Sequence, residues 1–242
     1  MSWEAAAASL RRPYRLTLPM VVLALPVPFY IFIGEETANR AVPVPTLFLD
    51  RALPLQPAWA LVYGCVYLFL IVLPIFIVRD EELIRRTLLA YLTVWISAYV
   101  VFLLHPTIAP RPVKVIGDGF VVWGLRFLYD SDPPYNCFPS LHVAHSCVSA
   151  FAAYRVHRGV GIIAGFGAAL VAVSTLFTKQ HYVLDVIAGA LLASIAYLIF
   201  LRGYSRDRVP ELDRRAAPAL AVGVSGIVAV MFACYFFAYL VT

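Results

Sequence analysis

The chain has 242 residues, of which 62% are hydrophobic and 14% are charged. This composition excludes an ordinary soluble domain, in which about a quarter of the residues are charged. Because alternating barrel strands are absent, helices are the only way for the backbone to satisfy its hydrogen bonds in lipid. The net charge of +5 is explained by basic loops between apolar segments, so we expect no nucleic-acid partner.

Seven apolar segments are long enough, or nearly so, to cross a bilayer as helices. They lie at residues 16–33, 59–78, 87–104, 140–156, 160–177, 182–201 and 216–241. Residues 1–242 are therefore predicted to form one all-α, polytopic integral membrane domain. The arginines before the first segment resemble the start of a signal peptide, but no small-residue cleavage site follows, so we expect this helix to be retained.

Prolines indicate local departures from straight helices, and pairs of small residues indicate close contacts between helices. Pro19, Pro26 and Pro28 predict a kink or an irregular stretch in the first segment. The proline-rich stretch 34–58 is typical of a loop at the membrane interface. Gly189 with Ala193, and Gly223 with Gly226, indicate close contacts between helices.

The distribution of positive charge predicts the orientation of the chain. With the N-terminus in the cytoplasm, the inner segments hold thirteen of the nineteen basic residues: Arg11, Arg12, Arg15, Arg79, Arg85, Arg86, Arg155, Arg158, Arg202, Arg206, Arg208, Arg214 and Arg215. The end of the third segment, the starts of the fourth and sixth, and the end of the fifth then meet at the extracytoplasmic face.

Two histidine-containing clusters lie at that face, Cys137–His145 and Thr178–Asp185. Ionisable groups are costly at a membrane boundary, so they indicate function. Two helix N-termini direct N–H groups to the same region, which favours an anion such as phosphate. Arg111 adds positive charge, and so do the nearby basic residues Lys114, Arg126 and Lys179.

The spacing of the ionisable residues indicates phosphoryl transfer. His181 and Asp185 are four residues apart in the predicted sixth helix, so the carboxylate can orient the imidazole as a nucleophile. His142 supplies a second imidazole to protonate the leaving alkoxide. We expect a phosphohistidine intermediate without a metal or cofactor, because cations and helix ends can neutralise the phosphoryl oxygens.

These residues resemble the signature of the type 2 phosphatidic acid phosphatase (PAP2) superfamily, which is Lys-x6-Arg-Pro, Pro-Ser-Gly-His and Ser-Arg-x5-His-x3-Asp. Arg111-Pro112 matches the first block, and Pro139-Ser-Leu-His142 matches the second. Ser174-Thr175, followed by His181 and Asp185, matches the third. The resemblance implies a six-helix core over residues 16–201, with the helix at 216–241 as an addition.

The resemblance also implies a role for each matched residue. His181 would be the nucleophile, Asp185 its orienting partner and His142 the general acid. Arg111, Ser140 and the backbone at Leu141 would bind the phosphate.

The sequence departs from the family signature at two expected cations. The family's Lys would fall at Leu104, and its second Arg is Thr175. Lys179 is expected to replace one cation, and Lys114 or Arg126 the other.

The residues of these blocks resemble the branch containing inositol phosphorylceramide synthases and related lipid phosphotransferases more than the simple phosphatidic acid phosphatases. There a phospholipid or lipid phosphate is the donor, and an alcohol such as inositol or ceramide is the acceptor. The alternative is a PAP2-type phosphatase, in which water accepts the phosphoryl group of phosphatidic acid or a polyprenyl phosphate. A non-catalytic lipid-binding protein and a proton-coupled transporter are further alternatives, although a transporter distributes its polar groups through the bilayer.

Several residues near the clusters have structural interpretations. His145 is expected to be a hydrogen-bonded packing residue, and Cys137 shows no zinc or disulfide spacing. The carboxylates of the long loop, Asp118, Asp130 and Asp132, are interpreted as solvated charges, with head-group selection as the alternative.

Overall fold

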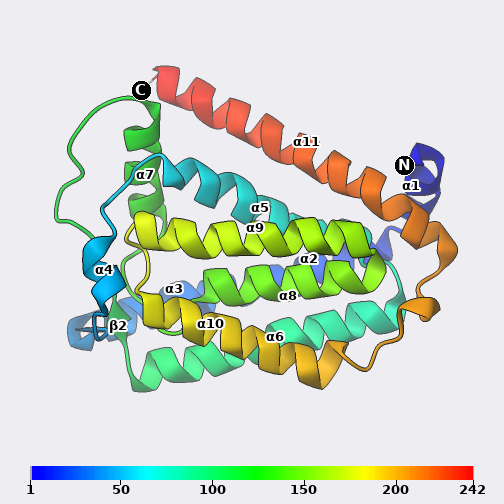
Figure 1. Cartoon of the computed structure of the whole chain (residues 1–242), viewed down its shortest axis with the longest axis horizontal. Helices are drawn as coiled ribbons and strands as arrows, with labels where there is room; N and C mark the ends of the chain where they lie inside the picture. The colour runs from blue at the N-terminus through cyan, green and yellow to red at the C-terminus, as the bar shows by residue number, and fades with distance from the viewer. Residues whose placement is uncertain (1, 242) are drawn as a thin grey trace.

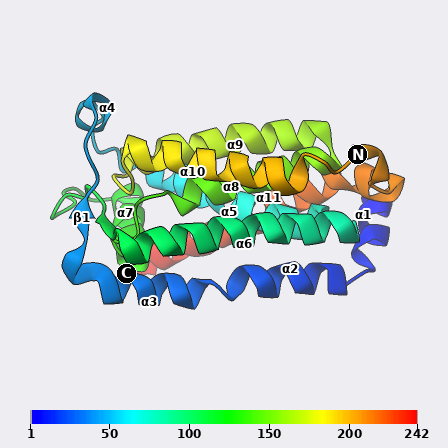
Figure 2. The same cartoon turned by 90° about the horizontal axis from the view of Figure 1, so that it is seen from below.

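Helices make up almost all of the regular structure in the computed structural model, which describes residues 2–241. Figure 1 shows the long helices side by side and Figure 2 shows the bundle from below. They are α5 (Trp59–Ile77), α6 (Glu81–Leu104), α8 (Leu141–Val156), α9 (Arg158–Phe177), α10 (Val183–Ala196) and α11 (Glu211–Val241). A π-helical turn, η2 (Tyr197–Leu201), continues α10. The predicted fold class, an all-α polytopic bundle, is confirmed.

The first predicted span is broken at a proline. It consists of α2 (Tyr14–Ala24) and α3 (Val27–Thr37), and Pro26 lies at the junction as the residue before α3. Proline lacks the N–H that would continue the helical hydrogen bonds, so the chain restarts there. Figure 2 shows α2 and α3 following one another beside α6. The kink predicted from the prolines is confirmed.

Six helical segments are long and apolar enough to cross a membrane by their length and composition. They are Tyr14–Arg40, Trp59–Ile77, Glu81–Leu104, Arg158–Phe177, Val183–Leu201 and Glu211–Val241. The remaining predicted span forms α8, which has only 16 residues. At ~1.5 Å per residue, α8 is shorter than a typical hydrocarbon core.

Helix α8 lies in the middle of the bundle. It packs against α5, α6, α9 and α10, and most of its residues are buried within the protein. Because it meets protein on most sides, it is built from small residues such as Ala and Ser as well as apolar ones. The polar site at its first turn is therefore shielded from lipid by the surrounding helices.

Short elements cover the end of the bundle where α8 begins. Strand β1 (Val42–Pro43) pairs in parallel with β2 (Thr107–Ile108), and a short helix α4 (Phe48–Ala52) follows β1. The loop after α6 contains α7 (Phe120–Ser131), which the sequence patterns did not predict. Figure 1 shows α7 lying across the ends of the bundle helices.

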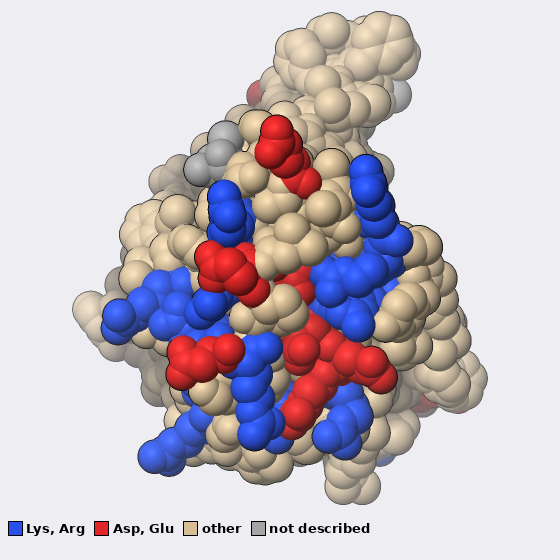
Figure 3. Space-filling model, turned by 90° about the vertical axis from the view of Figure 1, so that its right-hand side faces the viewer, with Lys and Arg blue, Asp and Glu red and all other residues tan. Residues whose placement is uncertain are grey.

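The opposite end of the bundle carries a dense set of charges, which Figure 3 views directly. Helix α1 (Trp3–Leu10) packs there against α11. Arg12 forms an ion pair with Asp213 at the start of α11, and buried Arg79 donates to the Ser9 carbonyl at 2.9 Å. These bonds attach the first and last helices to the core at one end.

Helices α8 and α10 approach closely at Gly189. A Cβ atom at this position would lie 2.4 Å from the carbonyl oxygen of Ser140. The predicted helix contact at Gly189 is therefore confirmed. The one predicted at Gly223 and Gly226 is wrong, because a Cβ atom at either position would meet nothing within 4 Å.

We expect Gly189→Ala to destabilise the protein by about 1–3 kcal/mol, because a backbone carbonyl has to move to admit the methyl group. The midpoint of thermal unfolding of the purified protein in detergent measures this effect. Gly223→Ala is the matched control and should leave the midpoint unchanged or raise it slightly. Equal midpoints for the two variants would contradict the close contact.

Candidate active site

The starts of α8 and α10 bring the two histidines of the signature into direct contact. His142 lies in the first turn of α8, and His181 lies in the turn before α10. Nδ1 of His142 and Nε2 of His181 are 3.0 Å apart, which is hydrogen-bond distance. The predicted meeting of these distant segments at one end of the bundle is therefore present in the structure.

Asp185 caps the start of α10 and also contacts His181. Its Oδ2 accepts a hydrogen bond from the Tyr182 backbone N–H at 2.8 Å, which caps the start of α10. The same oxygen lies 3.3 Å from Nδ1 of His181. Both residues are almost fully buried, so the carboxylate fixes the imidazole in an enclosed setting.

The contact between His181 and Asp185 does not arise from one helix face. Helix α10 begins at Val183, so His181 precedes it, and our placement of both residues within the helix is wrong. The physical reason is the capping turn, in which the Asp185 side chain folds back to the residues before the helix. The four-residue spacing works equally well in this geometry.

Ser140 is the N-cap of α8. Its Oγ accepts from the Val143 backbone N–H at 3.4 Å, and its own N–H donates to the Asp185 carbonyl at 3.0 Å. The residue is fully buried. Leu141, the first residue of the helix, is also buried. Their backbones position His142 at the start of α8.

Arg111 reaches the site from the loop after α6 and is held on several sides. Its Nη1 donates to the Tyr129 carbonyl at 3.2 Å, and its guanidinium carbon lies 4.6 Å from the Tyr129 ring centroid. Its Nη2 donates to Oε1 of Gln180, the residue directly before His181. The guanidinium is thereby fixed next to the histidines.

Two donors beside the histidines have no acceptor among the described residues. They are Nε of Arg111 and Nε2 of Gln180, and both are buried. Unpaired buried donors are costly unless a ligand satisfies them. Gln180 was missed in the sequence because the family signature does not include it; its position next to His181 was the available signal.

Asp132 is a second residue that the sequence interpretation missed. Its Oδ2 lies 3.9 Å from Nη2 of Arg111 and 3.8 Å from Nε2 of His142. Its Oδ1 accepts a hydrogen bond from the Tyr30 hydroxyl at 3.0 Å. The interpretation as a solvated charge is therefore wrong for Asp132. Burial raises the pKa of this carboxyl, and Arg111 partly opposes the shift.

Aromatic side chains form the wall beside His142. The ring centroids of Tyr63 and Tyr67 lie 5.1 and 4.9 Å from that of His142. A cavity of about 150 Å³ opens next to it and is lined by Val27, Tyr30, Tyr67, Trp95, Leu141, His142 and His145. The surroundings of the histidine are thus mainly apolar and aromatic.

His145 lines the same cavity but makes no hydrogen bond. Both of its ring nitrogens are buried without a partner among the described residues. Its ring instead packs 4.3 Å from that of Tyr91, measured between centroids. Our expectation of a hydrogen-bonded residue is therefore wrong, because the adjacent side chains of α5 and α6 present aromatic rings.

Two of the expected replacement cations are directed elsewhere. Nζ of Lys179 donates to the carbonyls of Asp50 and Leu53, at 3.1 and 2.6 Å, and so attaches the α10 turn to α4. Arg126 donates to the carbonyl of Gly117 at 2.6 Å in its own loop.

The third expected cation, Lys114, is exposed and makes no hydrogen bond or ion pair with any described residue. Of the cations proposed from sequence, Arg111 alone contacts the site within residues 2–241. The residues at the two positions where the family has cations lie in different environments. Leu104 is exposed at the end of α6, whereas buried Thr175 accepts the Gln180 backbone N–H at 2.9 Å and shapes the turn before His181.

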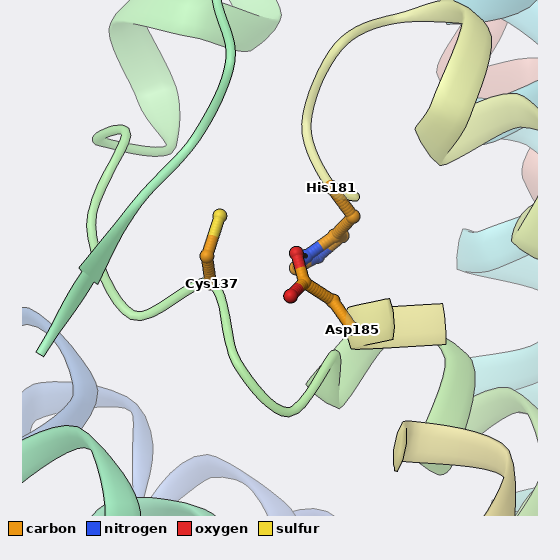
Figure 4. Close-up of side chains that lie close together, drawn as sticks. All are labelled: Cys137, His181 and Asp185. Carbon is orange, nitrogen blue, oxygen red and sulfur yellow. Dashed lines mark hydrogen bonds and ion pairs between the residues drawn. The ribbon is translucent and has the colours of Figure 1, made fainter. Parts of the chain in front are cut away.

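Cys137, His181 and Asp185 form a compact buried group, shown in Figure 4. One potential ligand atom from each lies within 4.8 Å of the others. The Cys137 thiol donates to the Gln180 carbonyl at 3.3 Å, and burial together with Asp185 raises its pKa well above the usual value. A metal-bound cysteine is a thiolate, so these residues fit a hydrogen-bonded network better than a metal site.

Comparison with known proteins agrees with this geometry. The family model described as PAP2 superfamily matches residues 41–199, a range that contains both histidines, Asp185 and Arg111. The chain belongs to the PAP2 superfamily.

The chain is also similar to one curated protein over part of its length. The chain is 29% identical over 121 residues to a PA-phosphatase related-family protein of Dictyostelium discoideum. The alignment covers 44% of this chain and 22% of the relative, so the chain spans only part of that protein's length. No solved structure matches the chain.

We expect Asp132→Asn to tighten binding of orthovanadate, a phosphate analogue, by about tenfold. Removing a carboxylate from beside Arg111 and His142 relieves repulsion of the bound anion, and a ~1.4 kcal/mol gain corresponds to this factor. Protection against thermal unfolding by vanadate measures the affinity. Asp130→Asn removes the same charge from an exposed position of α7 and should change nothing; an equal effect there would refute the local repulsion.

Proposed function

We propose that this protein transfers a lipid phosphoryl group through a phosphohistidine on His181. The observation that carries the proposal is the connected series of Asp185, His181 and His142, with Arg111 beside it. The carboxylate faces Nδ1 of His181, so that nitrogen carries the hydrogen and Nε2 keeps its lone pair. The hydrogen between the two rings then belongs to Nδ1 of His142.

The proposed reaction has two steps. In the first, Nε2 of His181 attacks phosphorus and the bond from phosphorus to the donor oxygen breaks. His142, protonated on both ring nitrogens before the reaction, gives one proton to that oxygen and becomes neutral. In the second, His142 takes the proton of an acceptor hydroxyl, whose oxygen attacks phosphorus and releases His181. The substrate phosphoryl group has to separate the two imidazoles, which lie 3.0 Å apart.

The phosphoryl oxygens would be neutralised by Arg111, by the Gln180 side-chain amide and by the N–H groups that begin α8. The unpaired donors on Arg111 and Gln180 support this role. Ser140 and Leu141 contribute through the backbone of that first turn. No step in this route requires a divalent metal or a cofactor.

We favour transfer to an alcohol over hydrolysis. The aromatic wall formed by Tyr63 and Tyr67 favours exclusion of water from the phosphohistidine. The residues of the signature blocks resemble those of inositol phosphorylceramide synthases. This resemblance also supports transfer to an acceptor such as inositol or ceramide. The second candidate is hydrolysis of a lipid phosphate, which the PA-phosphatase related relative favours.

We propose that the N-terminus is cytoplasmic and that the histidine site faces the extracytoplasmic side. The excess of arginine at the opposite end of the bundle supports this orientation. The donor headgroup would then enter from the outer leaflet.

The phosphohistidine is tested by brief exposure of the purified protein to a radiolabelled phospholipid donor in the presence of a chelator. We expect acid-labile label on the protein, and none on His181→Ala, which also loses at least about 10³-fold in turnover because it has no nucleophile. His157→Ala, at the far end of α8, is the control and should label normally. Full labelling of His181→Ala would refute the proposed nucleophile.

Transfer is separated from hydrolysis by identifying the products. We expect that a phospholipid donor incubated with inositol or ceramide yields a new phospholipid, detected by mass, at a rate above that of hydrolysis. The His181→Ala protein controls for spontaneous exchange. Free phosphate or phosphorylated headgroup as the only product, whichever acceptor is added, would assign the protein to the phosphatases.

A further inference from the structure

A basic hollow lies at the end of the bundle opposite the histidines. It has a volume of about 660 Å³ and is lined by Arg155, Arg158, Arg202, Gly203, Tyr204, Ser205, Arg206, Asp207 and Arg214. These residues come from the end of α8, the start of α9, the loop after η2 and the start of α11. Because α8 begins at the histidine site and ends here, the hollow is separated from that site by the length of a helix.

Arg155 lines this hollow and is held in place by the fold. Its Nη2 donates to the Tyr197 hydroxyl at 2.6 Å and to the Arg202 carbonyl at 3.1 Å. Its guanidinium also lies over the Tyr197 ring, 5.2 Å from the centroid. Fixing a guanidinium before a ligand arrives lowers the entropy lost on binding.

Tyr154 contacts two further arginines of the hollow. Nε of Arg158 donates to its hydroxyl at 3.3 Å, and the Arg206 guanidinium lies 5.2 Å from its ring centroid. Positive groups on two neighbouring helix ends and one loop are therefore brought together by aromatic side chains.

Positive charge in the hollow exceeds negative charge. Among its lining residues Asp207 is the single carboxylate, and Arg214 is paired with Glu211 at 2.7 Å. In the part of the chain that the structure describes, the Nε donors of Arg155, Arg206 and Arg214 are buried without an acceptor. Buried charged donors that lack acceptors and belong to residues lining one hollow favour an anionic ligand.

We propose that this hollow binds the phosphate groups of an anionic phospholipid headgroup, at a site separate from the catalytic one. Basic pockets between membrane helices recognise lipids such as cardiolipin in this way. The apolar surface next to the hollow fits a lipid chain. Ile162 and Phe166 follow Arg158 at four-residue intervals on α9, on the same helix face, and both are largely exposed. A headgroup in the hollow would thus place its acyl chain along α9.

Native mass spectrometry of the full-length protein in detergent with tetraoleoyl cardiolipin tests the proposal. We expect a retained cardiolipin adduct whose Kd rises about tenfold or more in Arg202→Gln/Arg206→Gln, because two charge-assisted contacts are lost. Arg215→Gln is the matched control, since it removes a charge from an exposed position of α11 outside the hollow. Arg111→Gln, at the histidine site, should also retain the adduct.

Two results would overturn the proposal. The first is equal cardiolipin affinity in Arg202→Gln/Arg206→Gln and Arg215→Gln. The second is protection of the protein from thermal unfolding by inorganic pyrophosphate that is as strong as that by cardiolipin, is kept in Arg111→Gln and is lost in Arg202→Gln/Arg206→Gln, which would assign the hollow to a soluble anion. If the double variant fails to fold, Arg158→Gln takes its place, because this exposed side chain bonds only to Tyr154 among the described residues, and the same rise in Kd is expected.

Discussion

The close contact between the start of α8 and the start of α10 is the constraint on which the geometry of the site depends. Gly189 admits the Ser140 carbonyl at a distance that no side chain allows, and the Ser140 N–H bonds to the Asp185 carbonyl. The Asp185 side chain meanwhile caps α10 and faces His181. Helix capping, helix packing and orientation of the imidazole therefore share one small set of bonds, so a shift of either helix also separates His142 from His181.

The proposed anion site beside this helix contact has fewer cationic residues than the family signature. Arg111 is the cation at the histidines among the described residues, and the neutral amide of Gln180 binds it. Asp132 adds a carboxyl group at the edge of the same region. If the proposed reaction takes place here, the fewer positive charges and the additional carboxyl group would favour a substrate that binds mainly through its apolar part. The aromatic wall beside His142 supports this expectation.

Helix α8 connects two functional proposals of different kinds. Its first turn carries the histidine chemistry, and its last turn carries Arg155 in the basic hollow. Because α8 is buried among the membrane helices, a lipid bound at the hollow would stabilise the same packing that holds His142 near His181. Such a lipid would act as a structural partner of the protein.

Much of the fold could be predicted from the sequence. The apolar composition and the length of the apolar segments predict a bundle of membrane helices, and Pro26 predicts a break in the first one. The spacing of His142, His181 and Asp185 predicted a cluster of ionisable side chains, and the structure brings these three residues together. The destinations of Lys179 and Asp132 depended on tertiary structure, because each side chain has several partners within reach and only the folded loops select one. The sequence by itself thus determined the helical membrane fold and the residues of the histidine cluster, both of which depend on residue type and spacing. Only the tertiary structure decided the charge of the anion site and the basic hollow, because long side chains from separate segments meet there through packing that no local pattern records.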